Sequence, residues 1–144
     1  MNSIRYMLSF AFLLILISFT QAQERSPKDV VLLWTEVYGI DFDRASDLTT
    51  LNFREGKTKK DWAAQASKIL KAAKYRHLGG KVIAEKIEGN QAFIILDASI
   101  DTIAGGAKQK ELYELQSVDG YWLIDDIIVK EEEVEEKDPD EKRI

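Results

Sequence analysis

From residue 81 onward the chain alternates apolar and polar residues with a period of two, and this pattern constrains the fold more than any other feature. It predicts strands at about 81–88, 91–102, 107–118 and 121–129. Short turn signals separate these strands, and Asp119-Gly120 is typical of a tight hairpin because both positions tolerate positive φ. Four consecutive strands joined by such short loops predict an antiparallel meander.

The residues before this sheet repeat at helical spacing, so helices precede strands and the sequence predicts an α+β fold. Ser26-Pro27 is typical of a helix start, and Gly39 ends the apolar stripe that follows it. Residues 41–48 can form one or two further turns. Thr58 begins the last helix with a capping pattern, and we expect that helix to end at Gly79-Gly80. The apolar faces of the two longer helices are expected to pack on one side of the sheet.

At 144 residues the chain suggests one domain, which we place at 23–129. A positively charged start, an apolar run and small residues at 20–22 predict a signal peptide over 1–22 that is cleaved before Gln23. The alternative is a retained membrane anchor, although the apolar run is short for a span. We therefore expect an exported protein, periplasmic or secreted, with no membrane span after cleavage.

Residues 130–144 contain eight acidic and four basic residues and predict a disordered acidic tail. The alternative is a docking segment for a basic partner. The whole chain has a formal net charge of −5 and no basic stripe interleaved with aromatic residues, so nucleic-acid binding is not expected.

The chain has no cysteine and a single histidine, His77, which limits the chemistry available to it. Disulfides, thiolate metal sites and histidine-rich metal sites are excluded. Motifs typical of nucleotide binding, metalloproteases and nucleophile elbows are absent from the sequence. We expect no metal, no cofactor and, on balance, no enzyme. His77 is expected to cap the end of the last helix, near the negative end of its dipole.

The last predicted strand carries two adjacent carboxylates, Asp125 and Asp126. Neighbouring strand residues point to opposite faces, so these carboxylates cannot form an acid/base pair unless a bulge intervenes. If Trp122 faces the core, then Asp126 faces inward with it. Asp126, as a base, and Tyr113 are the candidates for catalytic groups. The alternative is that Asp126 is solvated or ion-paired at the rim of the sheet.

Aromatic side chains on the predicted helices and strands could line a ligand pocket together with the inward carboxylate. The expected pocket residues are Trp34, Tyr38, Trp62, Tyr113, Trp122 and Asp126. Buried tryptophans and tyrosines more often belong to the core, so the alternative is that these rings fill the interior.

Four stretches together resemble one known superfamily. They are Ser26-Pro27 with the helix through Tyr38, the turn at 41–48, the hairpin at 88–94 and the hairpin at 113–124. This order resembles the nuclear transport factor 2-like, or cystatin-like cone, superfamily, and within it the small exported bacterial proteins of the lumazine-binding-protein-like group. The resemblance covers about residues 26–129.

The resemblance implies a cone-shaped domain, in which helices pack on a curved four-stranded meander around a pocket. Isomerases, dehydratases, cyclases, binding modules and assembly factors share such a fold, so the fold alone does not assign an activity. It also implies a possible homodimer through the convex face of the sheet. The outward apolar residues expected there are Phe93, Ile95, Leu123 and Ile127.

These observations favour a non-enzymatic exported module that binds a small apolar ligand or an envelope protein partner. One alternative is a small enzyme of isomerase, dehydratase or cyclase type that uses an inward carboxylate. The other is a purely structural interaction protein.

Overall fold

The computed structural model describes residues 24–132 and confirms the predicted α+β fold. The helices are α1 (Pro27–Val37), α2 (Phe42–Asp47) and α3 (Lys59–Ala72), and the strands are β1 (Arg76–Glu88), β2 (Gln91–Thr102), β3 (Gly105–Val118) and β4 (Tyr121–Glu131). The strands are antiparallel and lie in chain order, as expected for a meander. The predicted signal peptide and residues 133–144 of the predicted tail lie outside the described residues.

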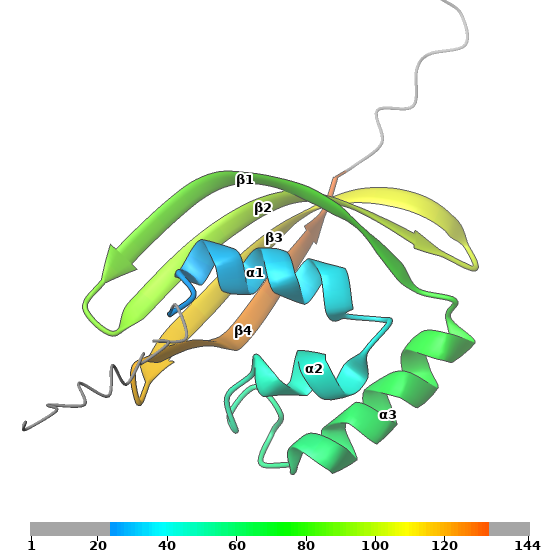
Figure 1. Ribbon diagram of the computed structural model, residues 1–144. Coiled ribbons are helices and arrows are strands. Elements are labelled where there is room, and N and C mark those ends of the chain that lie inside the picture. The colour runs from blue at the N-terminus through cyan, green and yellow to red at the C-terminus, as the bar shows by residue number, and fades with distance from the viewer. Residues whose placement is uncertain (1–23, 133–144) are drawn as a thin grey trace, which may run out of the picture.

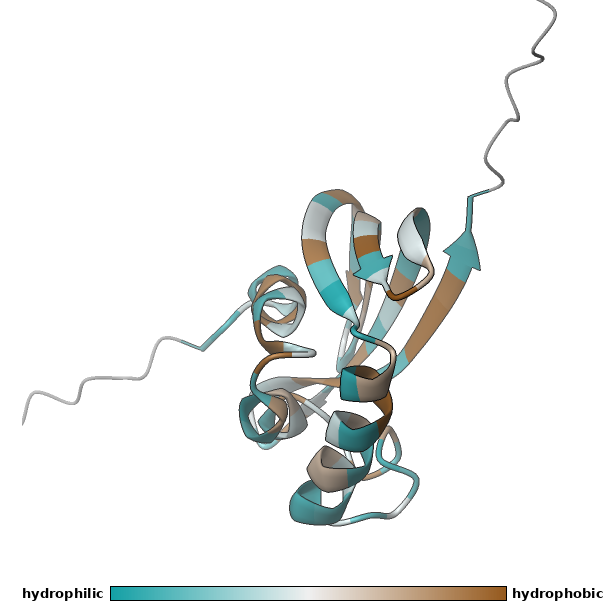
Figure 2. Cartoon of the chain, turned by 90° about the vertical axis from the view of Figure 1, so that its right-hand side faces the viewer, coloured by the Kyte–Doolittle hydropathy of each residue, from teal (hydrophilic) through white to brown (hydrophobic). Residues whose placement is uncertain are grey.

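The sheet curves, and α1 lies along its concave side (Figure 1). Helix α1 contacts β1, β2 and β4, whereas α3 packs mainly against α2. The expectation that both longer helices pack on the sheet is therefore wrong for α3. The physical reason is its weak apolar face, since Ala63 is its one buried residue and Ile69 is 58% exposed. Figure 2 shows hydrophilic and weakly apolar positions alternating along this helix.

The helix starts form as the capping residues predict. The Ser26 hydroxyl accepts a hydrogen bond from the Asp29 backbone N–H at 3.2 Å, and the Thr58 hydroxyl accepts one from the Asp61 N–H at 3.1 Å. Each cap satisfies one of the backbone donors that a helix start leaves free.

The end of α3 differs from the prediction. The helix ends at Ala72, Lys74 adopts a left-handed conformation with φ of 50°, and β1 begins at Arg76. The backbone N–H of Ile103 donates to the Ala73 carbonyl at 2.8 Å, so the β2–β3 hairpin is joined to this helix end. His77 therefore lies on a strand, and the expectation that it caps the helix is wrong.

The core lies between α1 and the concave face of the sheet. Val30, Val31 and Trp34 of α1 are almost fully buried against the face formed by alternate residues of β2, which confirms the predicted alternation of that strand. Burying an aliphatic or aromatic side chain of this size contributes about 2 kcal/mol each. The buried β2 residues are Ala92, Ile94, Leu96 and Ala98.

The regular alternation of the sheet is interrupted at three places. In β1 the register shifts between His77 and Gly80 and again between Val82 and Ala84. In β4 it shifts where Glu114 pairs with Asp126 but Leu115 pairs with Ile124. Each extra residue moves the following side chains to the opposite face of the sheet.

Candidate functional site

A cavity of about 390 Å³ opens on the concave side of the sheet. Its walls come from α1, the loop after α2, the segment before β1, and strands β2, β3 and β4. The lining residues are Trp34, Tyr38, Phe53, Tyr75, Ile100, Gln109, Glu111, Tyr113, Ile127 and Val129. Most of this wall is aromatic or aliphatic, and one carboxylate interrupts it.

The aromatic part of the wall is a chain of ring contacts. Trp34 stacks on Tyr38 with ring centroids 4.4 Å apart, and Tyr38 meets Tyr75 edge-on at 5.5 Å. Phe53 meets Trp34 edge-on at 5.5 Å. Gly39 permits this arrangement, because a Cβ there would lie 3.2 Å from the Tyr75 ring. Such ring pairs contribute about 1 kcal/mol beyond their burial and hold the wall in shape.

The polar part of the wall is a buried network centred on Glu111, whose side chain is 3% exposed. The Tyr113 hydroxyl donates to Oε1 at 2.8 Å, and the Gln109 amide donates to Oε2 at 2.6 Å. His77 Nε2 lies 2.8 Å from Oε1 and 3.2 Å from Oε2. Three donors therefore converge on one carboxylate.

Alternation along β3 and a bulge in β1 bring these groups together. Gln109, Glu111 and Tyr113 occupy alternate positions of β3, so all three face the concave side. On β1, counting back by twos from Gly80 would place Leu78 inward. The register shift places His77 inward instead, opposite Ile100, and leaves Leu78 exposed.

The hydrogen bonds of His77 identify its tautomer. Its Nδ1 accepts a hydrogen bond from the Gly79 backbone N–H at 2.9 Å, so Nδ1 carries no proton. Its Nε2 faces a carboxylate, which only accepts, so Nε2 carries the proton. These two contacts fit the Nε2–H tautomer of His77, in which the imidazole donates a hydrogen bond to Glu111.

The pKa values of these groups reflect this arrangement. Burial by itself raises the pKa of Glu111, but hydrogen bonds from His77, Tyr113 and Gln109, with the electrostatic influence of His77, bring its pKa below the usual value. Burial, and then the Glu111 charge, raise the pKa values of Tyr38, Tyr75 and Tyr113. The cavity wall thus combines an ionised carboxylate with three protonated phenols.

The two adjacent aspartates of β4 lie elsewhere. Asp125 is the extra residue of the β4 bulge, and its carboxylate accepts a hydrogen bond from the Thr50 hydroxyl at 2.7 Å. Asp126 is exposed and pairs across the sheet with Glu114, and its Oδ1 accepts from the Ile127 backbone N–H at 2.9 Å. The expectation that Asp126 faces inward with Trp122 is wrong, because the bulge reverses the alternation between them.

The same bulge changes one predicted outward residue. Ile127 lines the cavity, so its assignment to the convex apolar patch is wrong. Phe93, Ile95 and Leu123 are half-buried, and Phe93 and Ile95 occupy the β2 positions that alternate with the core residues.

The five aromatic residues of the predicted pocket line three different hollows. Trp34, Tyr38 and Tyr113 line the cavity described above. Trp62 lines a neighbouring hollow of about 280 Å³ that shares Tyr38. Trp122 lines a third hollow of about 570 Å³, formed by the β3–β4 hairpin and the residues before α1.

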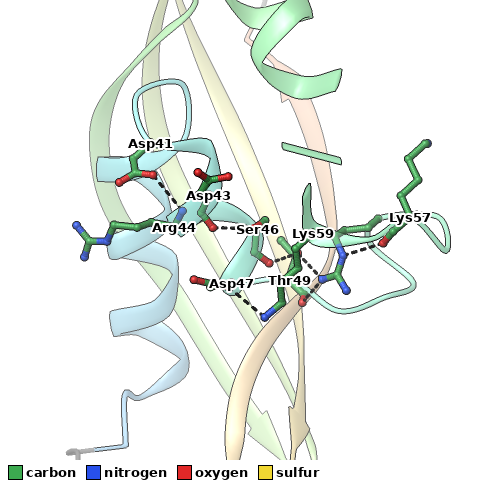
Figure 3. A network of polar contacts seen from close by, with 9 residues as sticks. Asp41, Asp43, Arg44, Ser46, Asp47, Thr49, Lys57 and Lys59 are labelled. Carbon is green, nitrogen blue, oxygen red and sulfur yellow. Dashed lines mark hydrogen bonds and ion pairs between the residues drawn. The ribbon is translucent and has the colours of Figure 1, made fainter. Parts of the chain in front are cut away.

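The loop between α2 and α3 is held by its own polar contacts, several of which are drawn in Figure 3. Lys59 pairs with Asp47 at 3.1 Å, and the Thr49 hydroxyl donates to the Ser46 carbonyl at 2.7 Å. Arg54 is buried and donates to the Thr49 and Lys57 carbonyls. This loop supplies Phe53 to the cavity. The Arg54 guanidinium donates to backbone carbonyls and not to Glu111.

Within residues 24–132 no group of three or more acidic or histidine side chains is arranged to hold a metal ion. In the same part of the chain, no helix has the length and apolar character needed to cross a membrane.

Two residues of the network, Glu111 and Gln109, were not among the predicted site residues. A signal for them exists in the sequence, because they lie two and four residues before Tyr113, which was among the predicted pocket residues. The inward position of His77 has no comparable signal, since it depends on a bulge in β1.

Sequence comparisons identify no relative: no family model matches the chain, and no curated protein matches it. Comparison with solved structures does find similar folds. A protein of unknown function from Cytophaga hutchinsonii, described as NTF2-like, is 18% identical with a TM-score of 0.51, and the match covers 76% of this chain and 92% of that one. A domain of unknown function with a cystatin-like fold from Nostoc punctiforme is 15% identical with a TM-score of 0.56, covering 76% and 80%.

Bd1075 from Bdellovibrio bacteriovorus is 8% identical with a TM-score of 0.56, and the match covers 69% of this chain. The chain spans only 37% of the length of Bd1075. At these identities the likeness concerns the fold alone. The order of elements, with helices before a curved antiparallel meander, agrees with the folds described for these neighbours. The chain therefore has the nuclear transport factor 2-like, cystatin-like fold.

Proposed function

We propose that this protein is an exported, non-enzymatic module that binds a small, largely apolar ligand in the concave cavity. The observation that carries this proposal is the cavity of about 390 Å³, whose wall is mainly aromatic and aliphatic with few convergent polar groups. Ligand sites in proteins have roughly this composition, with volumes of roughly 300–1,000 Å³. Export rests on the signal-peptide pattern of residues 1–22.

The position of the aromatic rings supports an open cavity. Trp34 is almost fully buried and packs flat against Tyr38, so its ring forms a wall and does not fill the space. Trp62 and Trp122 line other hollows.

The enzymatic alternative is less favoured by the chemistry of the inward carboxylate. Glu111 is held by three donors, and its pKa lies below the usual value. A carboxylate stabilised in this way is a weaker base, whereas proton abstraction near neutral pH is favoured by a raised pKa. This geometry is therefore better suited to holding charge than to transferring a proton.

Binding of a protein partner, or a homodimer, is the second candidate, and one feature of the convex face favours it. Ala84, Ile95, Leu112 and Ile128 pair in register and form an apolar row across all four strands. Ile128 is 43% exposed. A continuous apolar row on an open sheet face suits an interface. Analytical ultracentrifugation of the domain, with Leu112→Glu as the disrupting variant, tests this candidate.

The ligand proposal is tested with N-phenyl-1-naphthylamine, a neutral fluorescent probe of apolar cavities. We expect saturable binding to residues 23–144, with loss of binding in Ile127→Trp, whose larger side chain fills the cavity. The matched control is Ile128→Trp, because Ile128 is the next residue and faces the opposite side of the sheet. Equal binding by both variants would contradict the proposal. An intact mass that begins at Gln23, measured on protein from the envelope or medium, tests export.

A further inference from the structure

The Glu111 network has one feature that ligand size and apolarity do not explain, which is the negative charge of a buried carboxylate. Within residues 24–132 the one ion pair recorded for Glu111 is with His77, and that contact is ionic only if the imidazole is protonated. Protonating Nδ1 would place a second proton against the Gly79 N–H, 2.9 Å away. The backbone therefore opposes the charged form of His77.

A buried carboxylate without a partner cation is costly, and three hydrogen bonds reduce this cost without removing the charge. His77, Tyr113 and Gln109 make four contacts with the two oxygens of Glu111. The negative charge can still attract a cation in the cavity, because Glu111 belongs to its lining.

The rest of the lining suits a positive charge. Tyr38, Tyr75 and Trp34 place aromatic rings around the same cavity. The faces of such rings attract cations, and a desolvated ammonium group gains most from them. Arg54, which is buried in the loop that supplies Phe53, donates to the carbonyls of Thr49 and Lys57 and not to Glu111.

We propose that the cavity selects an organic cation, a ligand with an ammonium head group whose charge is balanced by Glu111 and whose apolar part contacts the aromatic wall. This inference rests on the proposed ligand-binding function and names the chemical class of the ligand.

The test compares choline with 3,3-dimethylbutan-1-ol, in which a carbon atom replaces the quaternary nitrogen and the shape is kept. Isothermal titration calorimetry on residues 23–144 should show choline binding about tenfold more tightly than the alcohol, as expected for a cation beside aromatic rings and a carboxylate. Glu111→Gln should abolish this preference. Glu114→Gln is the matched control, since it is the same change on the same strand but on the outer face, and it should keep the preference.

Equal binding of the two probes, or binding of the alcohol alone, overturns the cation inference and leaves the proposed function intact. Binding of neither probe also overturns the inference, and the naphthylamine titration then decides the proposed function separately. If circular dichroism shows that Glu111→Gln is unfolded, Tyr75→Leu replaces it, and choline should then lose more affinity than the alcohol.

A second measurement tests the charge argument without any ligand. His77 is the only histidine of the chain, so its ring gives one pair of ¹⁵N signals. At neutral pH we expect the Nε2 signal of a protonated nitrogen and the Nδ1 signal of an unprotonated one. Two protonated nitrogens would mean that His77 neutralises Glu111, which would overturn the inference.

Discussion

Two bulges in the same sheet have opposite consequences for the candidate site. In β1 the extra residue between His77 and Gly80 turns the imidazole inward, where it meets Glu111. In β4 the extra residue Asp125 turns Asp126 outward and brings Ile127 into the cavity wall. The same local irregularity adds a polar group to one wall of the cavity and removes one from the other.

Which polar side chains face this cavity therefore depends on the bulges in β1 and β4. The regular positions of β3 supply a carboxylate, an amide and a phenol to the concave face. The β1 bulge completes their hydrogen bonding, and the β4 bulge prevents a second carboxylate from facing the first. A second inward carboxylate would add like-charge repulsion to a buried site.

The largest expected effect comes from removing Glu111, the carboxylate that His77 meets because of the β1 bulge. Glu111→Ala leaves three buried donors without an acceptor, so we expect a loss of about 4 kcal/mol in the free energy of unfolding. Glu114→Ala, on the outer face of the same strand, should cost less than about 1 kcal/mol. Urea unfolding of both variants measures the difference. Similar losses would show that the network contributes little to stability.

A somewhat smaller effect is expected from the β1 bulge itself. A Cβ at Gly80 would lie 2.3 Å from the Asp97 carbonyl oxygen, so Gly80→Ala must displace the β1–β2 pairing and should cost about 3 kcal/mol. At Gly79, φ is 87° and a Cβ would meet nothing within 4 Å. Gly79→Ala should therefore cost about 1 kcal/mol from backbone strain alone. Thermal denaturation ranks the two, and the reverse order would contradict the close approach of β1 to β2.

At acid pH the Glu111 carboxylate becomes protonated, so the folded protein should lose the stabilisation that depends on its charge. The pKa of Glu111 in the folded protein lies below its ordinary value of 4.5. A group of this kind stabilises the fold above its unfolded pKa, and the contribution is lost as pH falls through the folded pKa. Below about pH 4.5 the melting temperature of the wild type should therefore fall more steeply than that of Glu111→Gln. Parallel acid profiles would exclude Glu111 as the titrating group.

The smallest effect is expected at the β4 bulge. Asp125→Ala removes the hydrogen bond from Thr50 and should cost about 1 kcal/mol. Asp126→Ala, at the next residue, changes an exposed side chain and should stay within about 0.5 kcal/mol. Thr50→Val combined with Asp125→Ala should cost less than the sum of the two single changes, because both remove the same bond, while Thr50 also accepts from the Phe53 N–H and Asp125 from the Asn52 amide. Additive losses in this double-mutant cycle would mean that the two side chains do not interact in solution.

The order of elements was readable from local patterns. Period-two alternation, the Asp119-Gly120 turn, and the capping residues Ser26 and Thr58 each act within a few residues of sequence. Such signals predicted three helices followed by a four-stranded meander, with Phe93 and Ile95 on the outer face of β2. The candidate site was less predictable, although Glu111 follows from the inward position of Tyr113 by the same alternation.

The sequence by itself therefore determined the element order, the helix starts and the faces of the regular strands, because short-range sterics and hydrogen bonds dictate them. The tertiary structure decided the positions of His77 and Asp126, because a bulge depends on what each strand meets across the sheet. Gly80 approaches the backbone of Asp97 closely, and Asp125 is bonded to Thr50, 75 residues away in the chain. Such long-range contacts leave no periodic trace in the sequence, and they determine which polar groups face the cavity.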